Sequence, residues 1–362
     1  MLIVDDSTVM RSQIRMALEG VDGIEVVGFA SNGQLACEFL KSRSADIVIL
    51  DLEMPVLDGL GTLEQMKRQG FAGRVIVFSA QTEGGAASTL AALNAGAADF
   101  IAKPSMEQPG GSPHEVIRRY LLPKLLQFCA AGERVPEIRP AARLRSGRRN
   151  SPRWICVFVR RSYVVIASST GGPNALEKLF SFIQGPLSAP ILIAQHMPPL
   201  FTASLAERLA RVSGLPVREA VAGETVRPGH VYIAPGDFHM RVVRGLNETS
   251  LALDQGAPRN SVRPAADYLF ESAAAAFGRD VLGLVLTGMG ADGRDGAVAL
   301  KNAGCPVLAQ DRESCVVFGM PAAVIEAGAP ILSAISRPWP RRWRTWAFCR
   351  LTETAGKRGV PA

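Results

Sequence analysis

The sequence predicts an α/β protein with two domains, each built on a mainly parallel, doubly wound β-sheet with helices on both faces. In both halves of the 362-residue chain, short apolar runs alternate with stretches whose apolar residues recur at helical spacing. A segment rich in arginine, proline, glycine and alanine separates the halves, a composition typical of linkers. We therefore expect a first domain over residues 1–130, a flexible basic linker over 131–162, a second domain over 163–335 and an atypical basic tail over 336–362.

Five short apolar runs predict the strands of the first sheet. They are residues 2–4, 24–30, 46–50, 74–78 and 99–102. The helices expected between and after them are residues 8–19, 33–41, 60–69, 84–95 and 114–128. Functional sites of such folds lie at the carboxyl ends of the strands, so the residues that follow the strands are the candidates.

The residues at these strand ends suit phosphoryl chemistry on a metal ion. Asp5 and Asp6 follow the first strand, and Asp51 follows the third. Three carboxylates at one sheet edge repel one another unless a cation neutralises them, and hard oxygen ligands suit Mg²⁺. A carboxylate beside that ion can attack a phosphoryl group. Ser79 and Lys103 follow the fourth and fifth strands, where they could hydrogen-bond and pair with the phosphate.

The motifs IVDDS, DLEMPVLDGL, FSA and AKP of this domain resemble those of two-component response-regulator receiver domains, which are flavodoxin-like. The resemblance implies that Asp51 is the phospho-acceptor. The metal ligands that it implies are Asp5, Asp6, Asp51 and the backbone carbonyl of Glu53. The switch residues that it implies are Ser79, Phe100 and Lys103. The family usually has a few more residues before the first strand, so the true start could lie upstream.

Three segments of the second half predict another sheet with a site at its edge: 162–168, 189–199 and 280–293. Ser169 follows the first strand in a strand-to-helix turn with Gly171 and Gly172 behind it. Such a turn exposes a hydroxyl beside backbone N–H groups and so serves a nucleophile and an oxyanion hole. On its own, the same turn could also be a phosphate-binding or merely tight glycine turn.

His196 and Asp292 complete a candidate Ser-His-Asp triad with Ser169. Among the histidines, His196 is the one at the carboxyl end of a strand that leads into a helix. The other three are His114, His230 and His239. Asp292 lies in the glycine-rich loop after the third strand, where a carboxylate could orient the histidine and stabilise its imidazolium.

Two alternatives remain open from the residues alone. The loop Gly288–Gly293 fits the GxGxxG pattern of dinucleotide binding, with Asp311 18 residues beyond it. However, Asp292 inside the loop would repel a pyrophosphate, and Ser169 and His196 would have no role. The second alternative is a non-enzymatic response regulator whose second domain is a binding module and whose basic segments contact nucleic acid.

Five motifs in fixed order behind the first domain resemble the CheB family of chemotaxis protein-glutamate methylesterases. They are VVIASSTGGP, AQHMP, HVYIAPGDFHM, LTGMGADG and AQDRESCVVFGMP. The resemblance spans about residues 1–128 and 163–328, and it implies Ser169, His196 and Asp292 as the catalytic residues. In this chain Ala167 and Ser168 replace the usual Gly-Ala before the nucleophile, a small change that we expect to be tolerated.

The family resemblance also implies the reaction and its partners. We expect a phosphorylation-activated esterase that removes methyl groups from glutamyl residues of methyl-accepting chemoreceptors and deamidates receptor glutamines. A chemotaxis histidine kinase is the expected phosphodonor. Backbone N–H groups near Thr170 or Met289 are expected to stabilise the oxyanion. The receiver requires Mg²⁺ for phosphorylation, and ester hydrolysis requires no cofactor.

The net charge of +7 is concentrated in two segments. Residues 139–161 contain eight arginines and no acid, and residues 337–362 carry a net charge of +6, which leaves −7 for the rest. We therefore do not expect nucleic acid as a partner. The segment WICVFVRR (154–161) could be an edge strand or a misassigned stretch, and the tail suggests a shifted reading frame or a divergent extension.

Membrane insertion and disulfide chemistry are not expected. No apolar run reaches the ~18 residues that suggest a membrane span, and the N-terminus lacks the pattern of a signal peptide. The six cysteines show no CxxC spacing. These features predict a cytoplasmic protein with reduced thiols.

Overall fold

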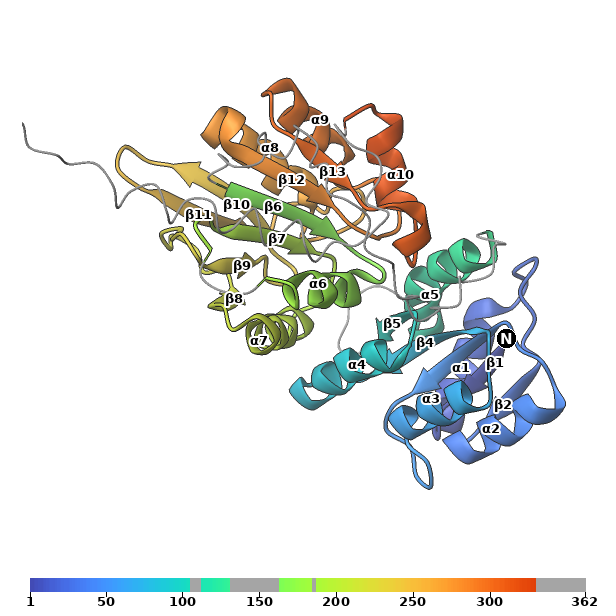
Figure 1. The fold of residues 1–362 in the computed structure, drawn as a ribbon. Helices are drawn as coiled ribbons and strands as arrows, with labels where there is room; N and C mark the ends of the chain where they lie inside the picture. Colours follow the sequence, from blue (N-terminus) through green and yellow to red (C-terminus); the bar gives the residue numbers. More distant parts are fainter. Residues whose placement is uncertain (105–111, 131–162, 184–186, 330–362) are drawn as a thin grey trace, which may run out of the picture. The chain divides into compact units, whose positions relative to one another are not determined.

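The computed structural model describes residues 1–104, 112–130, 163–183 and 187–329, and these fold as two compact units (Figure 1). The expected linker, including WICVFVRR, and the expected tail lie outside the described residues. No helix of the described segments is long and apolar enough to cross a membrane.

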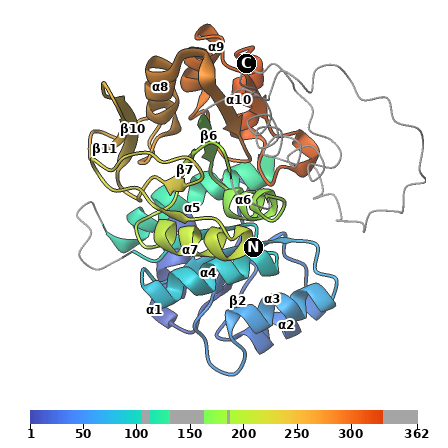
Figure 2. The ribbon, with the colours of Figure 1, turned by 60° about the vertical axis from the view of Figure 1, so that its left-hand side comes forward.

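The first unit contains five parallel strands in the order β2-β1-β3-β4-β5, as a doubly wound fold requires. The strands are β1 (Leu2–Val4), β2 (Gly28–Ala30), β3 (Ile47–Asp51), β4 (Arg74–Ser79) and β5 (Asp99–Ala102). The helices are α1 (Thr8–Leu18), α2 (Gly33–Ser42), α3 (Gly59–Arg68), α4 (Glu83–Ala95) and α5 (Pro113–Ala130). Helix α1 packs against α5, and α3 packs against α2 and α4, so helices cover both faces of the sheet (Figure 2).

Polar residues that follow the strands start the helices of this unit. Ser7, Asn32, Asp58 and Thr82 each accept a hydrogen bond from a backbone N–H in the first turn of the helix that follows. The expected strand over 24–30 is shorter than predicted. Only 28–30 pairs with β1, because β1 offers three residues for pairing.

The second unit contains six parallel strands in the order β13-β12-β6-β7-β9-β8. The strands are β6 (Tyr163–Ser168), β7 (Ile191–Gln195), β8 (Val217–Glu219), β9 (Val231–Ile233), β12 (Val281–Val285) and β13 (Val307–Ala309). The helices are α6 (Gly172–Phe180), α7 (Phe201–Ser213), α8 (Ala266–Phe277), α9 (Arg294–Asn302) and α10 (Gly319–Glu326). An antiparallel hairpin joins β10 (His239–Arg244) to β11 (Thr249–Asp254). The parallel α/β architecture predicted for this domain is confirmed.

The core of the second unit fixes the strands that carry its candidate site. On one face of the sheet, alternate residues of β6 and β7 (Val165, Ala167, Leu192 and Ala194) are buried in one apolar cluster with residues of α8. The hairpin adds Met240 and Leu251 to the same cluster. Because β7, β12 and all of β6 after Tyr163 are buried, the carboxyl ends of these strands are held firmly at one edge of the sheet.

Candidate functional sites

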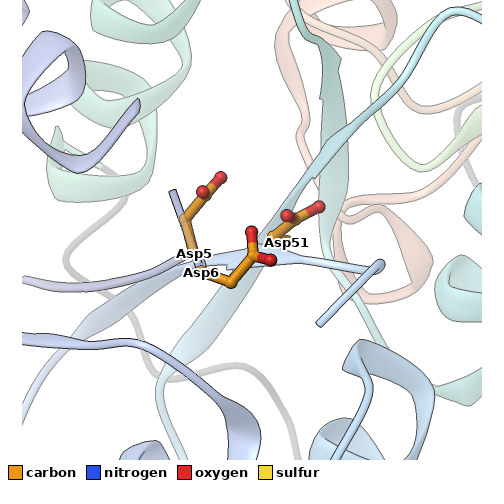
Figure 3. Close-up of side chains that lie close together, drawn as sticks. All are labelled: Asp5, Asp6 and Asp51. Atoms are coloured by element: carbon orange, nitrogen blue, oxygen red, sulfur yellow. The ribbon is translucent and has the colours of Figure 1, made fainter. Parts of the chain in front are cut away.

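The first candidate site lies at the carboxyl edge of the first sheet. Asp5 and Asp6 follow β1, Asp51 ends β3, and one ligand oxygen of each lies within 4.8 Å of the other two (Figure 3). Asp5 and Asp51 are buried, whereas Asp6 is exposed. The structure thus brings together the three carboxylates that the sequence predicted at this edge.

Lys103 after β5 neutralises only part of this charge. Its Nζ lies 2.7 Å from Asp51 Oδ2 and 3.2 Å from Asp5 Oδ2. Burial, opposed by Lys103 but reinforced by the charge of Asp51, raises the pKa of Asp5. Burial alone would lower the pKa of Lys103, but its hydrogen bonds and ion pairs with both carboxylates raise it. One ammonium beside three carboxylates leaves negative charge that suits a divalent cation with oxygen ligands.

The other predicted residues of this unit lie on the neighbouring strands. Ser79, the last residue of β4, is buried and its Oγ donates to the carbonyl of Gly85 at 3.1 Å. Phe100 on β5 is 7% exposed. The backbone N–H of Glu53 donates to Asp51 Oδ1 at 3.3 Å, so the loop after β3 folds around the carboxylate. Their roles in switching and metal binding stay predictions.

The second candidate site begins with the turn between β6 and α6, in which Ser169 is half-buried. The N–H of Ser169 donates to the carbonyl of Thr287 at 3.0 Å, which ties the turn to the loop after β12. Gly171 has a φ of +75°, a conformation that favours glycine. A Cβ on Gly172 would lie 2.1 Å from Gln195 Oε1, so the turn fits only without a side chain there.

His196 is the first residue after β7, beside this turn. In the register of β6 and β7, Ser168 pairs with Gln195, so Ser169 and His196 follow paired positions. The N–H of His196 donates to the carbonyl of Ser168 at 3.0 Å. The amide of Gln195 donates to the carbonyl of Ser169 at 3.0 Å and accepts from the Ser168 hydroxyl at 2.6 Å. The sheet therefore places the candidate nucleophile and base side by side.

Asp292 contacts His196 directly. Its Oδ2 lies 2.7 Å from His196 Nε2, and the two side chains are 2% and 9% exposed. A carboxylate without a proton only accepts, so Nε2 carries the hydrogen and Nδ1 of the neutral ring is left as the proton acceptor. The structure thus brings together the histidine and the aspartate that the sequence predicted as partners.

Asp292 is also held by three further donors. Its Oδ2 accepts from the N–H of Ala266 at 2.6 Å, and its Oδ1 accepts from Asn260 Nδ2 at 3.2 Å and the N–H of Asp267 at 3.3 Å. The two backbone donors begin helix α8, whose positive dipole end favours an anion. Burial opposes ionisation, but His196 and these donors outweigh it and lower the pKa of Asp292 to about 2.

The loop 288–290 lies against the nucleophile turn. A Cβ on Gly288 would lie 2.8 Å from Ser169 Cβ, so this backbone approaches the serine closely. Thr170 is buried, and its carbonyl accepts from the Thr287 hydroxyl at 3.0 Å. This proximity is consistent with an oxyanion hole near Thr170 or Met289, and the two N–H groups stay predictions.

The contacts of Asp292 and Asp311 argue against dinucleotide binding. The Asp292 carboxylate is turned to His196 and the start of α8. Asp311 accepts from the N–H of Ser314 at 2.9 Å, which makes it the cap of a short 3₁₀ turn. The Asp292 carboxylate is thus held within the protein, and Asp311 Oδ2 is buried, so neither presents an exposed acidic ligand to a ribose.

The other histidines have local partners. His114 lies 3.2 Å from Ser112 Oγ, and His230 stacks on Tyr232. His239 is fully buried in the fold, where its ring nitrogens contact the backbone of Ala257 and Ala265. Sequence reasoning missed Gln195, Thr287 and Asn260, whose side chains contact the triad or its turns. Gln195 and Thr287 lie within the quoted motifs AQHMP and LTGMGADG, but no periodicity or motif pointed to Asn260.

Comparisons with known proteins show which family the chain is similar to. A family model described as CheB methylesterase matches residues 164–336, and one described as response regulator receiver domain matches residues 1–109. The chain is 41% identical over 327 residues to a protein-glutamate methylesterase/protein-glutamine glutaminase of Trichodesmium erythraeum, covering 90% of this chain and 93% of that protein. A second such protein, from Caulobacter vibrioides, is 44% identical over 330 residues, with coverages of 90% and 92%.

A solved structure of a catalytic domain also matches about half of the chain. The crystal structure of the Thermotoga maritima CheB methylesterase catalytic domain is 44% identical in sequence, with a TM-score of 0.49. The match covers 52% of this chain and 98% of that one.

Proposed function

Because the chain belongs to the CheB family of response-regulator methylesterases, we propose that it removes methyl esters from glutamyl residues of methyl-accepting chemoreceptors and deamidates receptor glutamines. Phosphorylation of the receiver domain controls this activity. We assign the regulatory domain to residues 1–130 and the catalytic domain to residues 163–335. The observation that carries the proposal is the His196–Asp292 pair beside the strand-to-helix turn of Ser169.

Hydrolysis proceeds through an acyl-enzyme. The hydroxyl oxygen of Ser169 attacks the ester carbonyl carbon while His196 Nδ1 takes the hydroxyl proton. Asp292, ionised because its pKa is about 2, stabilises the imidazolium through Nε2. The backbone N–H groups of Thr170 or Met289 stabilise the oxyanion.

Collapse of the tetrahedral intermediate breaks the bond to the methoxy oxygen, and His196 donates its proton so that methanol leaves. His196 then takes a proton from water, the hydroxide oxygen attacks the acyl carbon, and Ser169 leaves with the proton returned by His196. The product is a glutamate carboxylate. Deamidation follows the same steps with ammonia as the leaving group, so one triad serves both reactions.

The receiver domain accepts a phosphoryl group on Asp51. The residues that would hold Mg²⁺ are Asp5, Asp6, Asp51 and the backbone carbonyl of Glu53. When bound, Mg²⁺ neutralises charge on the phosphoryl oxygens. Lys103, 2.7 Å from Asp51 in this structure, pairs with the phosphoryl group, and Ser79 turns from Gly85 to hydrogen-bond it. Phe100 then repacks as the switch residue. The phosphodonor is a chemotaxis histidine kinase.

The replacement Ser169→Ala tests the proposed nucleophile. We expect the rate of methanol release from a methylated receptor fragment to fall by on the order of 10⁶-fold, because no other group forms the acyl-enzyme. Ser181→Ala, at the exposed end of α6, is the matched control and should keep native activity. Methanol release by Ser169→Ala at a near-native rate would remove Ser169 from the mechanism.

A further inference from the structure

A second buried carboxylate lies beside the triad aspartate. Asp267, in the first turn of α8, has no exposed surface, and its own N–H donates to Asp292 Oδ1. Its Oδ1 accepts from the N–H of Gly296 at 2.8 Å. Two buried carboxylates at this proximity repel each other, so the orientation of Asp292 depends on what lies between them.

The amide of Asn260 lies between the two carboxylates. Its Nδ2 is 2.9 Å from Asp267 Oδ2 and 3.2 Å from Asp292 Oδ1. Because both partners are acceptors, the amide must direct its NH₂ group to them, with one hydrogen for each. Both donors of Asn260 are therefore committed to linking the triad aspartate to its buried neighbour, although the residue as a whole is exposed.

The turn that carries Asn260 is fixed in shape. Asn260 and Ser261 have φ angles of 53° and 63°, and the backbone of Arg259 exchanges two hydrogen bonds with that of Val262. The guanidinium of Arg259 makes two 2.8 Å hydrogen bonds to Glu271 on α8. A left-handed conformation is unfavourable for most residues, but asparagine tolerates it, so this position suits an asparagine.

His239 holds both ends of the segment that contains this turn. Its Nδ1 accepts from the N–H of Ala265 at 3.1 Å, so its Nε2 carries the hydrogen and donates to the carbonyl of Ala257 at 3.2 Å. This fully buried ring therefore has a structural role that the triad does not explain. It fixes the two ends of the segment 257–265, from which Asn260 reaches Asp292.

From this geometry we infer that Asn260 is a positioning residue of the esterase, which holds the Asp292 carboxylate with Oδ2 toward His196. The inference rests on the proposed function. Without the amide, Asp292 Oδ1 keeps one donor, the N–H of Asp267, and loses the side chain that links it to the Asp267 carboxylate. The carboxylate then rotates away from His196 Nε2, and the histidine loses the orientation that it needs to take the Ser169 proton.

Two replacements isolate the amide. Asn260→Gly removes the side chain and keeps the left-handed turn, and Asn260→Asp keeps the shape but replaces both donors by a third carboxylate. The matched control is Ser261→Gly, which makes the same backbone change one residue along the same turn. We expect kcat for methanol release to fall by on the order of 10- to 100-fold in both Asn260 variants with KM unchanged. Ser261→Gly should match the native protein.

Labelling of Ser169 by phenylmethanesulfonyl fluoride gives a readout that receptor binding does not affect. The labelling rate, followed by mass spectrometry, should fall with kcat in the Asn260 variants, while circular dichroism remains native. The inference is overturned if both variants keep native kcat, if KM alone rises, or if Ser261→Gly loses as much activity. Ser169→Ala, assayed in parallel, separates the two claims. If it is inactive while the Asn260 variants are native, only the role of Asn260 fails, whereas an active Ser169→Ala contradicts the proposed function itself.

Discussion

Asp292 is ionised although its burial alone would favour the protonated carboxyl group. Four donors compensate, and only one of them, His196, belongs to the proposed triad. The N–H groups at the start of α8 are among the others, so the capping role usual for an aspartate and the triad role are combined here. The pKa of about 2 means that Asp292 stays ionised over the range in which esterases work.

Replacing Asp292 by asparagine tests this account at the level of one residue. The amide can donate as well as accept, so it can favour the other tautomer of His196 and leave Nδ1 protonated. We expect kcat to fall by about 10⁴-fold with the fold retained, as in related triads. Asp295→Asn, on the more exposed first turn of α9, is the control. Methanol release and circular dichroism are the measurements, and equal kcat in the two variants would return Asp292 to a purely capping role.

At the scale of elements, the same arrangement of strands and site residues occurs in both units. In each unit, buried parallel strands end at one edge, and the residues that follow them form the site. This explains why Asp5, Asp51, Ser169 and His196 could be predicted from the sequence, since each lies directly after or at the end of an apolar run.

The remaining features could not be predicted for physical reasons. Strands β8, β9 and β13 have only three residues each, too few to show a period. Asn260 comes from an irregular turn 32 residues before Asp292, and its role depends on tertiary contacts of the Arg259 and His239 side chains. The domain boundaries also stay predictions, because the linker and tail lie outside the described residues.

The N–H of Gly296 on α9 donates to Asp267 Oδ1 on α8. Because Asp267 is buried, its titration predicts an unusual dependence of stability on pH. Burial, reinforced by the charge of Asp292, raises the pKa of Asp267 from 3.8 to about 6, against the opposing hydrogen bond from Gly296. Because the pKa of Asp267 is higher in the folded than in the unfolded protein, the protonated carboxyl favours folding. This stabilisation is fully present below the unfolded pKa of 3.8 and is lost as the pH rises through about 6. A shift of about two units corresponds to on the order of 3 kcal/mol.

Asp267→Asn removes this titration. We compare the unfolding free energies of the variant and the native protein at about pH 4 and at about pH 7. We expect the difference, variant minus native, to rise by on the order of 3 kcal/mol from the lower to the higher pH. Urea denaturation followed by circular dichroism at both pH values measures the change. Asp280→Asn, an exposed position after α8, should show no such gain. A difference between Asp267→Asn and native protein that is the same at both pH values would mean that Asp267 is ionised throughout.

At the scale of the whole molecule, the chain joins a phospho-acceptor site to a hydrolase that has no chemical use for it. Such a fusion is useful only if phosphorylation shifts an equilibrium between a less active and a more active state. A shift from 1:99 to 99:1 requires about 5.5 kcal/mol of differential stabilisation. In the proposed mechanism, charge-assisted hydrogen bonds from Lys103 and Ser79 to a phosphoryl group on Asp51 would supply part of it.

The most direct test of a phosphorylation-controlled esterase is methanol release from methylated receptor by the full chain, with and without acetyl phosphate and Mg²⁺. The account predicts that the donor labels Asp51 and raises the rate, that Asp51→Asn stays at the basal rate, and that Ser169→Ala releases no methanol under either condition. Labelling of Asp51 without a change in rate would contradict the proposed regulation, and donor-independent methanol release by Ser169→Ala would contradict the proposed chemistry.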